Sequence, residues 1–514
     1  MATLVELLRE SARNYGVHPA ILFQGRTITH SEFGELTDRV AAGLAAKGIV
    51  AGDRVALYCV NSDVFAAAYF GILKAGATVV PINLLLNPKE IAYILNDADA
   101  KTLIYHELFA EQARFLSQLA PGTARRICIG LSNPLHDISW DNLLSEGKEV
   151  PQPAIAEDDL AAILYTSGTT GHPKGAMLMH RNLAANVASI REALHLEPGK
   201  DVLLCVLPMF HAFAATVCMI FPLTNGCTLV PVPKFDPQGV ADAIAAHGVT
   251  VFAAVPSMFN VLLRLPAAEA TKLASLHFAV SGGAAMPVEV MRQFEKKFGK
   301  LIYEGDGPTE CSPVTCVNPI GGKRKPASVG LPIPRVEMKI VDEEGNELPH
   351  GTVGEIVVRG PNVMKGYWKQ PEETARSFFG KWFRTGDLGT EDDEGYFYIV
   401  DRKKDMLIVN GMNVYPRVIE EVLFQHPAIR EVAVVGEPDK LHGEIPVAYV
   451  SLKEGCEVTA SELRQFCLDN LGRHQVPRKF KFIPQLPRNA AGKVLKRELR
   501  MEGEYERGVD RRAL

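Results

Sequence analysis

The sequence predicts an α/β protein: a large N-terminal domain of two helix-covered, mainly parallel sheets plus a small β barrel, then a small mobile α+β C-terminal domain. Three observations lead to this prediction. The 514 residues are too many for one compact core. Up to residue 328, short β-branched runs alternate with helical patterns, as in parallel sheets covered by helices. After the charge cluster Asp401–Asp405, a new set of strands and helices begins.

The elements follow in chain order. The strands expected in the parallel sheets are Arg54–Cys59, Ala77–Ile82, Thr102–Tyr105, Val202–Leu207, Thr228–Val232, Thr250–Ala254 and His277–Ser281. Between residues 329 and 400, Gly-punctuated strands without long helices indicate the barrel or an antiparallel sheet: Val336–Val341, Gly354–Arg359 and Gly395–Val400. The last unit is expected to contain helices Val418–Gln425 and Ala460–Leu471 and strands Glu431–Val435 and Val447–Leu452. We therefore place the domains at 1–401 and 402–514.

Composition excludes several classes of protein. A net charge of −5 argues against a nucleic-acid binder. Nine cysteines without a C-x-x-C pair indicate neither a zinc site nor a disulfide framework, which favours a reducing, cytoplasmic compartment. The start of the chain has no export pattern, and the longest apolar stretches, Val64–Leu73 and Met209–Leu223, are too short to span a membrane. Peripheral membrane contact and a homodimer stay open.

The stretch Tyr165–Gly175 predicts a loop that binds phosphate. Its glycines let the backbone turn N–H groups toward an anion, its hydroxyls add donors, and Lys174 adds charge. The spacing differs from the usual phosphate loop of nucleotide triphosphatases. A flexible linker is disfavoured because the apolar runs Leu160–Tyr165 and Ala176–Met179 flank the loop. The candidate phosphate-binding residues are Thr166, Ser167, Gly168, Thr169, Thr170 and Lys174.

Further motifs follow this loop in a characteristic order. They are Leu207–His211, Ser281–Ala284, Gly305–Glu310, Trp382–Asp387, Asp401–Asp405 and Leu486–Lys493. Together with the loop they resemble the adenylate-forming superfamily of acyl-CoA synthetases, aryl-CoA ligases, luciferases and adenylation domains. The resemblance covers nearly the whole chain, and the overall sequence pattern is most similar to that of bacterial fatty-acyl-CoA synthetases.

The resemblance implies a two-step reaction with ATP, Mg²⁺ and coenzyme A. A carboxylate attacks the α-phosphorus of ATP and releases pyrophosphate, and a thiol then displaces AMP from the acyl adenylate. Thr166 and Glu310 match the positions that hold the metal, and Lys493 matches the lysine that bridges the carboxylate and the α-phosphate. Asp387 would accept the ribose hydroxyls, and Arg402 would reach the ribose or the phosphate.

The remaining assignments also come from the resemblance. The adenine and phosphate side would be lined by Gly283, Ala284, Glu304, Gly305, Asp306 and Thr309. The acyl pocket would be walled by His211, Val255, Gly282 and Gly283. Lys404 matches the hinge on which the small domain rotates, and Asn410, Gly411 and Asn413 would contact coenzyme A on its second face.

Asp306 departs from the pattern, because the family normally places an aromatic residue there to stack on adenine. Such stacking is worth about 1 to 3 kcal/mol per base. The small and apolar residues around the acyl pocket favour a medium- or long-chain fatty acid, and an aryl-CoA ligase of the benzoate or coumarate type fits the same composition. A module that binds acyl nucleotides without turnover is the alternative of another class.

Overall fold

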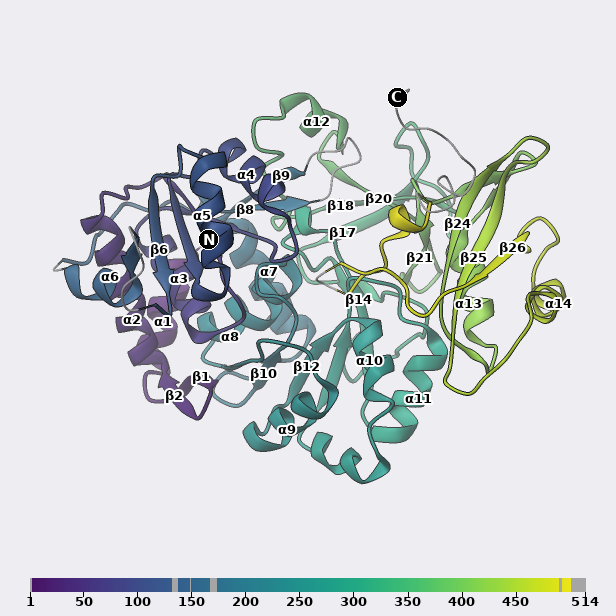
Figure 1. Ribbon diagram of the computed structural model, residues 1–514, viewed down its shortest axis with the longest axis horizontal. Coiled ribbons are helices and arrows are strands. Elements are labelled where there is room, and N and C mark those ends of the chain that lie inside the picture. The colour runs from purple at the N-terminus through teal and green to yellow at the C-terminus, as the bar shows by residue number, and fades with distance from the viewer. Residues whose placement is uncertain (1, 132–136, 148, 167–172, 490–491, 501–514) are drawn as a thin grey trace.

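The computed structural model describes residues 2–131, 137–147, 149–166, 173–489 and 492–500 (Figure 1). It confirms the α/β prediction, with two helix-covered sheets followed by an antiparallel sheet and a separate C-terminal unit. Within the described residues, no helix has both the length and the apolar character needed to cross a membrane.

The first sheet has seven strands. In spatial order they are β7 (Ile138–Ser139), β6 (Arg125–Ile129), β5 (Thr102–His106), β3 (Arg54–Tyr58), β4 (Thr78–Pro81), β8 (Leu160–Thr166) and β9 (Lys174–Met179). All neighbours are parallel except β8 and β9, which form an antiparallel pair with Thr166 opposite Lys174. The predicted phosphate loop therefore connects two adjacent antiparallel strands at the edge of this sheet.

The second sheet has nine strands. In spatial order they are β16 (Leu331–Pro332), β15 (Cys316–Val317), β14 (Ile302–Asp306), β13 (Phe278–Ser281), β12 (Val251–Ala254), β10 (Val202–Cys205), β11 (Thr228–Pro231), β1 (Pro19–Phe23) and β2 (Arg26–Thr29). Its central strands are parallel, so the residues that follow β12, β13 and β14 meet along one edge. Ligands of open parallel sheets bind at this kind of edge.

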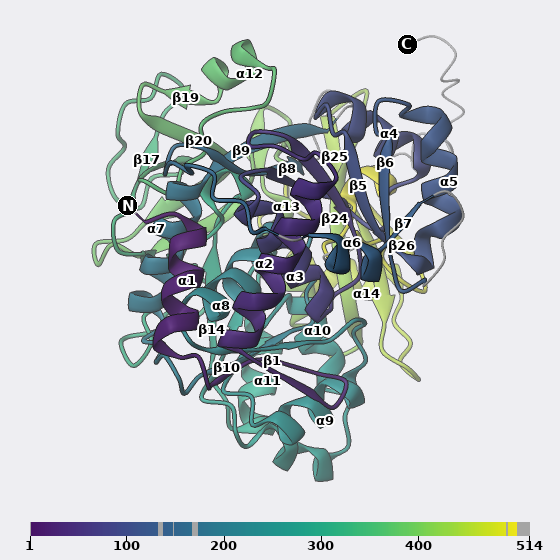
Figure 2. The same ribbon diagram turned by 90° about the vertical axis from the view of Figure 1, so that its left-hand side faces the viewer.

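Helices fill the space between and around the two sheets (Figure 2). They are α1 (Leu4–Asn14), α2 (His30–Ala46), α3 (Asp63–Lys74), α4 (Pro88–Asp97), α5 (Ala110–Leu119), α6 (Trp140–Glu146), α7 (His180–Ala193), α8 (Phe221–Thr224), α9 (Pro237–His247), α10 (Pro256–Leu262) and α11 (Val288–Phe298), with shorter turns η1 (Glu107–Phe109), η3 (Ala267–Leu273) and η4 (Thr309–Cys311) and the π-helix η2 (Ala214–Ile220). Every residue of α3 except Val64 is buried, and the largest core cluster joins both sheets through it.

Capping explains where several helices begin. Thr3 and Thr29 each accept a hydrogen bond from the backbone N–H of a glutamate three residues on, and that glutamate's side chain bonds back to the cap. This reciprocal box satisfies donors that a helix start leaves free. Such caps are readable in the sequence because they depend on neighbouring residues only.

The antiparallel sheet contains β17 (Glu337–Val341), β18 (Gly354–Arg359), β20 (Trp382–Glu391), β19 (Phe378–Phe379) and β21 (Phe397–Arg402). It lies above the second sheet in Figure 1, next to the short helix α12 (Pro371–Arg376). Asp387 and Arg402 stand opposite each other on β20 and β21. The strand β21 thus carries the chain from this sheet to the C-terminal unit.

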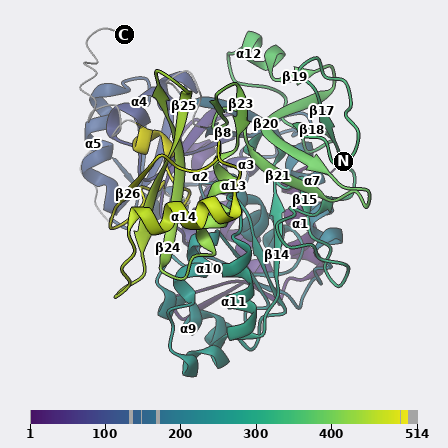
Figure 3. The ribbon, with the colours of Figure 1, turned by 90° about the vertical axis from the view of Figure 1, so that its right-hand side faces the viewer.

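The C-terminal unit has its own sheet and core. Its strands are β22 (Leu407–Val409), β23 (Met412–Val414), β24 (Ile429–Asp439), β25 (Gly443–Leu452) and β26 (Lys479–Phe482), and its helices are α13 (Pro416–Phe424) and α14 (Ala460–Asn470). Figure 3 shows α14 on the outer side, away from the large domain. Helix α13 contacts β21, so it lies on the inner side. The boundary at residue 401 stays a prediction; it falls one residue before the end of β21, and β22 begins at Leu407.

Candidate active site

Lys493 reaches a cleft of the large domain. It lines a cavity together with Leu207, Pro208, His211, Phe213, Val255, Gly283 and Asn489. The segment that carries Lys493 comes from the C-terminal unit, whereas most of the other residues follow strands β10, β12 and β13 of the second sheet. Residues from three distant motifs of the sequence therefore meet in one place.

The Lys493 segment is rigidified by its own hydrogen bonds. The Lys493 N–H donates to Asn489 Oδ1 at 2.8 Å, and the Asn489 N–H donates to the Lys493 carbonyl at 2.9 Å. Arg488 donates to the Gly492 carbonyl at 2.6 Å and pairs with Glu431 at 2.8 Å. Asn489 and Lys493 are thus bonded to each other, and Arg488 links the segment to Glu431 of the small domain.

Two hydrogen bonds join the C-terminal unit to helix α10 of the large domain, and both are long. Ser257 Oγ donates to the Gly492 carbonyl at 3.5 Å, and Asn260 Nδ2 donates to the Arg430 carbonyl at 3.4 Å. A Cβ on Gly492 would stand 2.9 Å from Val255 Cγ2. The absence of a side chain at this position therefore permits the close approach of the two domains.

The charges of Arg402, Lys404, Asp387 and Asp306 act on the Lys493 ammonium. Burial, followed by repulsion from Arg402, lowers the pKa of Lys493, while Asp387 and Asp306 act in the opposite direction. Burial, followed by Asp387, raises the pKa of Asp306 to about 6, against the attraction of Arg402 and Lys493. Asp306 thus shares the site with the cations that a triphosphate would contact.

Asp387 is paired with Arg402 in this structure. Arg402 Nε lies 2.7 Å from Asp387 Oδ1, and the carboxylate is largely buried. Asp387 first, with smaller contributions from Asp306 and Glu310, raises the pKa of Arg402. Accepting two ribose hydroxyls would require Asp387 to release at least part of this ion pair.

His211 lies where the two cavities of the cleft meet. Burial, with a smaller contribution from the Lys493 ammonium, lowers the pKa of His211 to about 4. The imidazole is therefore neutral near pH 7, and its Nδ1 accepts a hydrogen bond from the Phe213 N–H at 3.4 Å. A neutral ring can orient a carboxyl group without holding it as an ion pair.

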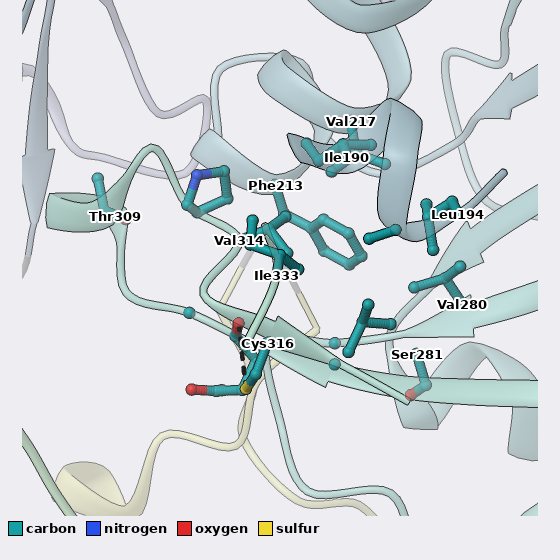
Figure 4. A pocket seen from close by; sticks show the side chains of 18 of the residues that line it. Ile190, Leu194, Phe213, Val217, Val280, Ser281, Thr309, Val314, Cys316 and Ile333 are labelled. Carbon is teal, nitrogen blue, oxygen red and sulfur yellow. Dashed lines mark hydrogen bonds between the residues drawn. The ribbon is translucent and has the colours of Figure 1, made fainter. Parts of the chain in front are cut away.

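The second cavity is largely apolar (Figure 4). It is lined by Ile190, Ala193, Leu194, His211, Phe213, Val217, Val280, Ser281, Gly282, Gly283, Gly305, Asp306, Gly307, Thr309, Pro313, Val314, Cys316, Val317 and Ile333. His211, Phe213 and Gly283 also line the Lys493 cavity, so the two are connected. Helix α7 supplies Ile190, and its C-cap is Leu194; sequence reasoning missed both because nothing local relates that helix to the motifs.

Phe213 stands at the junction of the two cavities. Its ring carbons Cε1 and Cζ lie 3.2 and 3.3 Å from the point where a Cβ on Gly282 would stand. In Figure 4 the ring projects toward Leu194 and Val280. An acid that enters the apolar cavity must therefore pass or displace this ring. The predicted Gly282 and Gly283 line this cavity together with Val217, while the predicted Val255 lines the Lys493 side.

Glu310 and Lys174 are both held by partners that the sequence did not reveal. The Tyr367 hydroxyl donates to Glu310 Oε1 at 2.8 Å. The Lys174 ammonium forms an ion pair with Glu373 of α12 and lies 5.5 Å from the centre of the Tyr367 ring. The expected phosphate cation is therefore paired with a carboxylate here, at the base of the loop.

Glu304 is buried between the two domains. Its Oε1 accepts a hydrogen bond from the Met286 N–H at 2.9 Å, whereas Oε2 is fully enclosed and has no partner. Burial raises the pKa of Glu304 to about 7, opposed by Arg417 of α13. Glu304 lines neither cavity, unlike its neighbours Gly305 and Asp306.

The other predicted site residues divide into three groups. Thr309 lines the apolar cavity, Ala284 directly follows the cavity residue Gly283, and Thr166 ends strand β8. Lys404 lies in the exposed turn between β21 and β22, and Asn410, Gly411 and Asn413 lie on an exposed hairpin that lines neither cavity. Ser167, Gly168, Thr169 and Thr170 lie outside the described residues.

The donor groups fit a Mg²⁺ ion that is bound jointly with phosphates. In the described part of the chain, no cluster of three or more His, Cys, Asp or Glu residues could hold a metal by itself. Proteins usually bind Mg²⁺ through one or two carboxylates plus the phosphates of the substrate. Glu310 offers one carboxylate, and the hydroxyl of Thr166 offers a further oxygen.

Comparison with known proteins gives matches over almost the entire chain. Residues 8–368 match the family described as AMP-binding enzyme, and residues 418–493 match the AMP-binding enzyme C-terminal domain. A long-chain-fatty-acid–CoA ligase of Bacillus subtilis (strain 168) is 37% identical over 535 residues, which cover 98% of this chain and 95% of the relative. A feruloyl-CoA synthase of an Amycolatopsis species is 34% identical over 482 residues, which cover 94% of this chain and 95% of that relative.

Solved structures superpose over almost the entire chain. ATP-bound MatB from Rhodopseudomonas palustris superposes with a TM-score of 0.90 at 33% identity, covering 97% of this chain and 98% of that one. The apo structure of the same protein gives a TM-score of 0.80 with the same identity and coverage. This chain thus superposes more closely on the ATP-bound structure than on the apo structure.

Proposed function

The chain belongs to the AMP-binding enzyme family, and we propose that it joins a medium- or long-chain fatty acid to coenzyme A through an acyl adenylate made from ATP. The observation that carries this proposal is the position of Lys493, in one cavity with His211 and Gly283, both of which also line the apolar cavity. An ammonium group there can hold a carboxylate against the α-phosphate, although the two anions repel each other.

In the first half-reaction, a carboxylate oxygen of the acid attacks the α-phosphorus of ATP. An oxygen–phosphorus bond forms, the bond from the α-phosphorus to the bridging oxygen breaks, and pyrophosphate leaves. Lys493 holds the two reacting anions, and Arg402 balances the charge that develops on the phosphate oxygens. Asp387 accepts the ribose hydroxyls after exchanging part of its ion pair with Arg402. Thr166 and Glu310 would hold Mg²⁺, which neutralises charge on the leaving pyrophosphate.

In the second half-reaction, the thiol of coenzyme A attacks the acyl carbon, and AMP leaves. We propose that the small domain first rotates about Lys404, which withdraws Lys493 and turns the hairpin of Asn410, Gly411 and Asn413 toward the thiol. The hydrogen bond from Ser257 Oγ to the Gly492 carbonyl is 3.5 Å long, which supports such a movement because little is lost when it breaks.

The apolar cavity favours a fatty acid. Each buried CH₂ contributes about 0.8 kcal/mol, and Ile190, Leu194, Val217 and Val280 offer an apolar wall. An aryl acid is the second candidate, favoured by the feruloyl-CoA synthase relative.

We further propose a cytoplasmic enzyme. The nine cysteines are free and all except Cys456 are buried, as in proteins of a reducing compartment. We also propose peripheral contact with membranes, from which an apolar acid could be drawn, and vesicle flotation tests it. We propose a homodimer as well, which size-exclusion chromatography tests.

One experiment tests the proposal. Pyrophosphate release is measured with short, medium and long fatty acids, benzoate and coumarate, each with and without coenzyme A. We expect release with fatty acids and acyl-CoA formation only when coenzyme A is present. Release with aryl acids alone would favour the second candidate, and no release with any acid would indicate a binding module.

The variant Lys493→Ala separates the half-reactions. We expect it to abolish adenylate formation while sparing thioester formation from supplied acyl adenylate, because the second step does not use the ammonium. Full adenylation activity in this variant would contradict the role of Lys493.

A further inference from the structure

Tyr367 lies between the base of the phosphate-loop hairpin and Glu310. Residues 364–368 run alongside β9: the Trp368 N–H donates to the Gly175 carbonyl at 2.8 Å, and the Met177 N–H donates to the Gly366 carbonyl at 2.9 Å. At the other end of this segment, the Met364 N–H donates to the Glu310 carbonyl at 2.7 Å. The backbone of this segment therefore connects strand β9 directly to the turn that carries Glu310.

The side chain of Tyr367 makes the same connection. Its hydroxyl donates to Glu310 Oε1 at 2.8 Å, while its ring lies under the ammonium of Lys174. Its backbone N–H donates to Thr374 Oγ1 at 2.8 Å, which ties it to helix α12. Only 9% of Tyr367 is exposed, so the packing around the ring allows the hydroxyl little freedom.

This arrangement assigns different tasks to the two charged groups. Lys174 is neutralised by Glu373, so its ammonium is engaged away from Glu310. Glu310 is held through Oε1 by a neutral donor, and its negative charge is retained. A phenol that donates to a carboxylate fixes the orientation of the carboxylate without cancelling its charge, which leaves the second oxygen available to a cation.

We propose that Tyr367 is a positioning residue that orients Glu310 for Mg²⁺ and so raises the affinity for the metal–nucleotide complex. This inference rests on the proposed function, in which Glu310 holds the metal. Without the hydroxyl, Glu310 would sample several rotamers and would lose conformational freedom on binding the ion. The residue would act on the metal-dependent part of nucleotide binding and on nothing else.

The variant Tyr367→Phe tests the proposal because it keeps the ring and its contact with Lys174. Calorimetry of the full chain with a non-hydrolysable ATP analogue, once with Mg²⁺ and once with EDTA, gives the gain in affinity that Mg²⁺ provides. We expect this gain to fall about tenfold in Tyr367→Phe. Affinity in EDTA should stay equal to that of the wild type.

Two further variants keep the test sharp. Tyr105 of strand β5 also donates its hydroxyl to a carboxylate, that of Asp137 at 2.7 Å. Tyr105→Phe is therefore the matched control and should retain the full gain in affinity from Mg²⁺. Glu373→Gln releases Lys174 but keeps the Tyr367 hydroxyl, and should also retain most of the gain. A loss in Glu373→Gln without a loss in Tyr367→Phe would overturn the proposal in favour of the ion pair.

The remaining outcomes separate this inference from the proposed function. A wild type that gains affinity from Mg²⁺, together with a Tyr367→Phe variant that gains equally, overturns the inference alone. A wild type that binds the analogue equally well in Mg²⁺ and in EDTA contradicts the metal role of Glu310 and overturns both.

Discussion

Gly492 offers the most direct test of how Lys493 is delivered to the large domain. Its φ is +80°, and a Cβ added there would meet Val255 Cγ2 at 2.9 Å and Ser257 Oγ at 3.1 Å, both across the domain interface. Substitution by alanine is therefore unfavourable in free energy for two separate reasons, backbone strain and a steric contact with the large domain. One arises within the small domain, and the other arises only when that domain is docked.

The magnitudes follow from these contacts. An alanine in the left-handed region costs about 1 to 2 kcal/mol in every orientation of the domain. The contact with Val255 adds about 1 to 3 kcal/mol of overpacking in the docked orientation only. Because about 1.4 kcal/mol corresponds to tenfold, adenylation by Gly492→Ala should fall roughly 5- to 150-fold more than thioester formation.

The assay measures the two half-reactions separately. Adenylation is followed as pyrophosphate release from ATP and acid, and thioester formation is started from supplied acyl adenylate and coenzyme A. The control is Gly455→Ala: Gly455 also lies in the small domain with φ +73°, but nothing lies within 4 Å of its added Cβ. The control has the backbone strain without the interdomain contact, so both half-reactions should stay near wild-type rates.

Two outcomes would refute this reasoning. If Gly492→Ala slowed both half-reactions equally, the substitution would act through the fold of the small domain rather than through docking. If it slowed neither, adenylation would not use the domain orientation seen here.

The other predictions concern nucleotide affinity, acid selection and pH dependence. Asp306→Tyr should tighten ATP or AMP binding, since stacking on adenine is worth about 1 to 3 kcal/mol; unchanged or weaker affinity by calorimetry would contradict this. Phe213→Ala should shift the acid profile of pyrophosphate release toward longer or bulkier acids, because the ring stands at the junction of the two cavities; an unaltered profile would show that the ring does not restrict entry. Glu304 has a folded-state pKa of about 7, above its ordinary value of 4.5, so the folded state holds the proton more tightly and wild-type stability should fall as pH rises from 4.5 to about 7. Glu304→Gln should reduce this fall by up to about 3 kcal/mol in denaturant melts across that pH range; identical pH profiles for the two proteins would argue against a buried protonated carboxyl.

Much of the fold could be predicted because its signals are local. The strand expected at Thr228–Val232 is β11 at Thr228–Pro231, and the helix expected at Val418–Gln425 is α13 at Pro416–Phe424. Apolar alternation, turn residues and caps act over a few neighbours, so each can be read without knowing the rest of the chain. The order of the motifs likewise indicated the family, because each motif carries its own chemistry.

The partners of the site residues could not be predicted in the same way. Lys174 is paired with Glu373, 199 positions later, and Glu310 is held by Tyr367, 57 positions later. Neither Tyr367 nor Glu373 belongs to a pattern that would distinguish it from an ordinary surface or core residue. The apolar cavity depends equally on Ile190 of α7 and on Leu194 at the C-cap of that helix, which reach the cavity only after the sheets have packed.

By itself, then, the sequence determined the kinds of element, the phosphate-loop hairpin and the chemical groups that the reaction needs. Tertiary structure alone decided that Lys493 lines a cavity with His211, that Arg402 forms an ion pair with Asp387, and that Phe213 lies at the junction of two cavities. The physical reason is the distance along the chain over which each kind of interaction acts. Propensity and capping act between neighbours in the chain, whereas the position of an ammonium group in a cleft depends on the packing of two domains whose contacting residues, such as Ser257 and Gly492, lie far apart in the sequence.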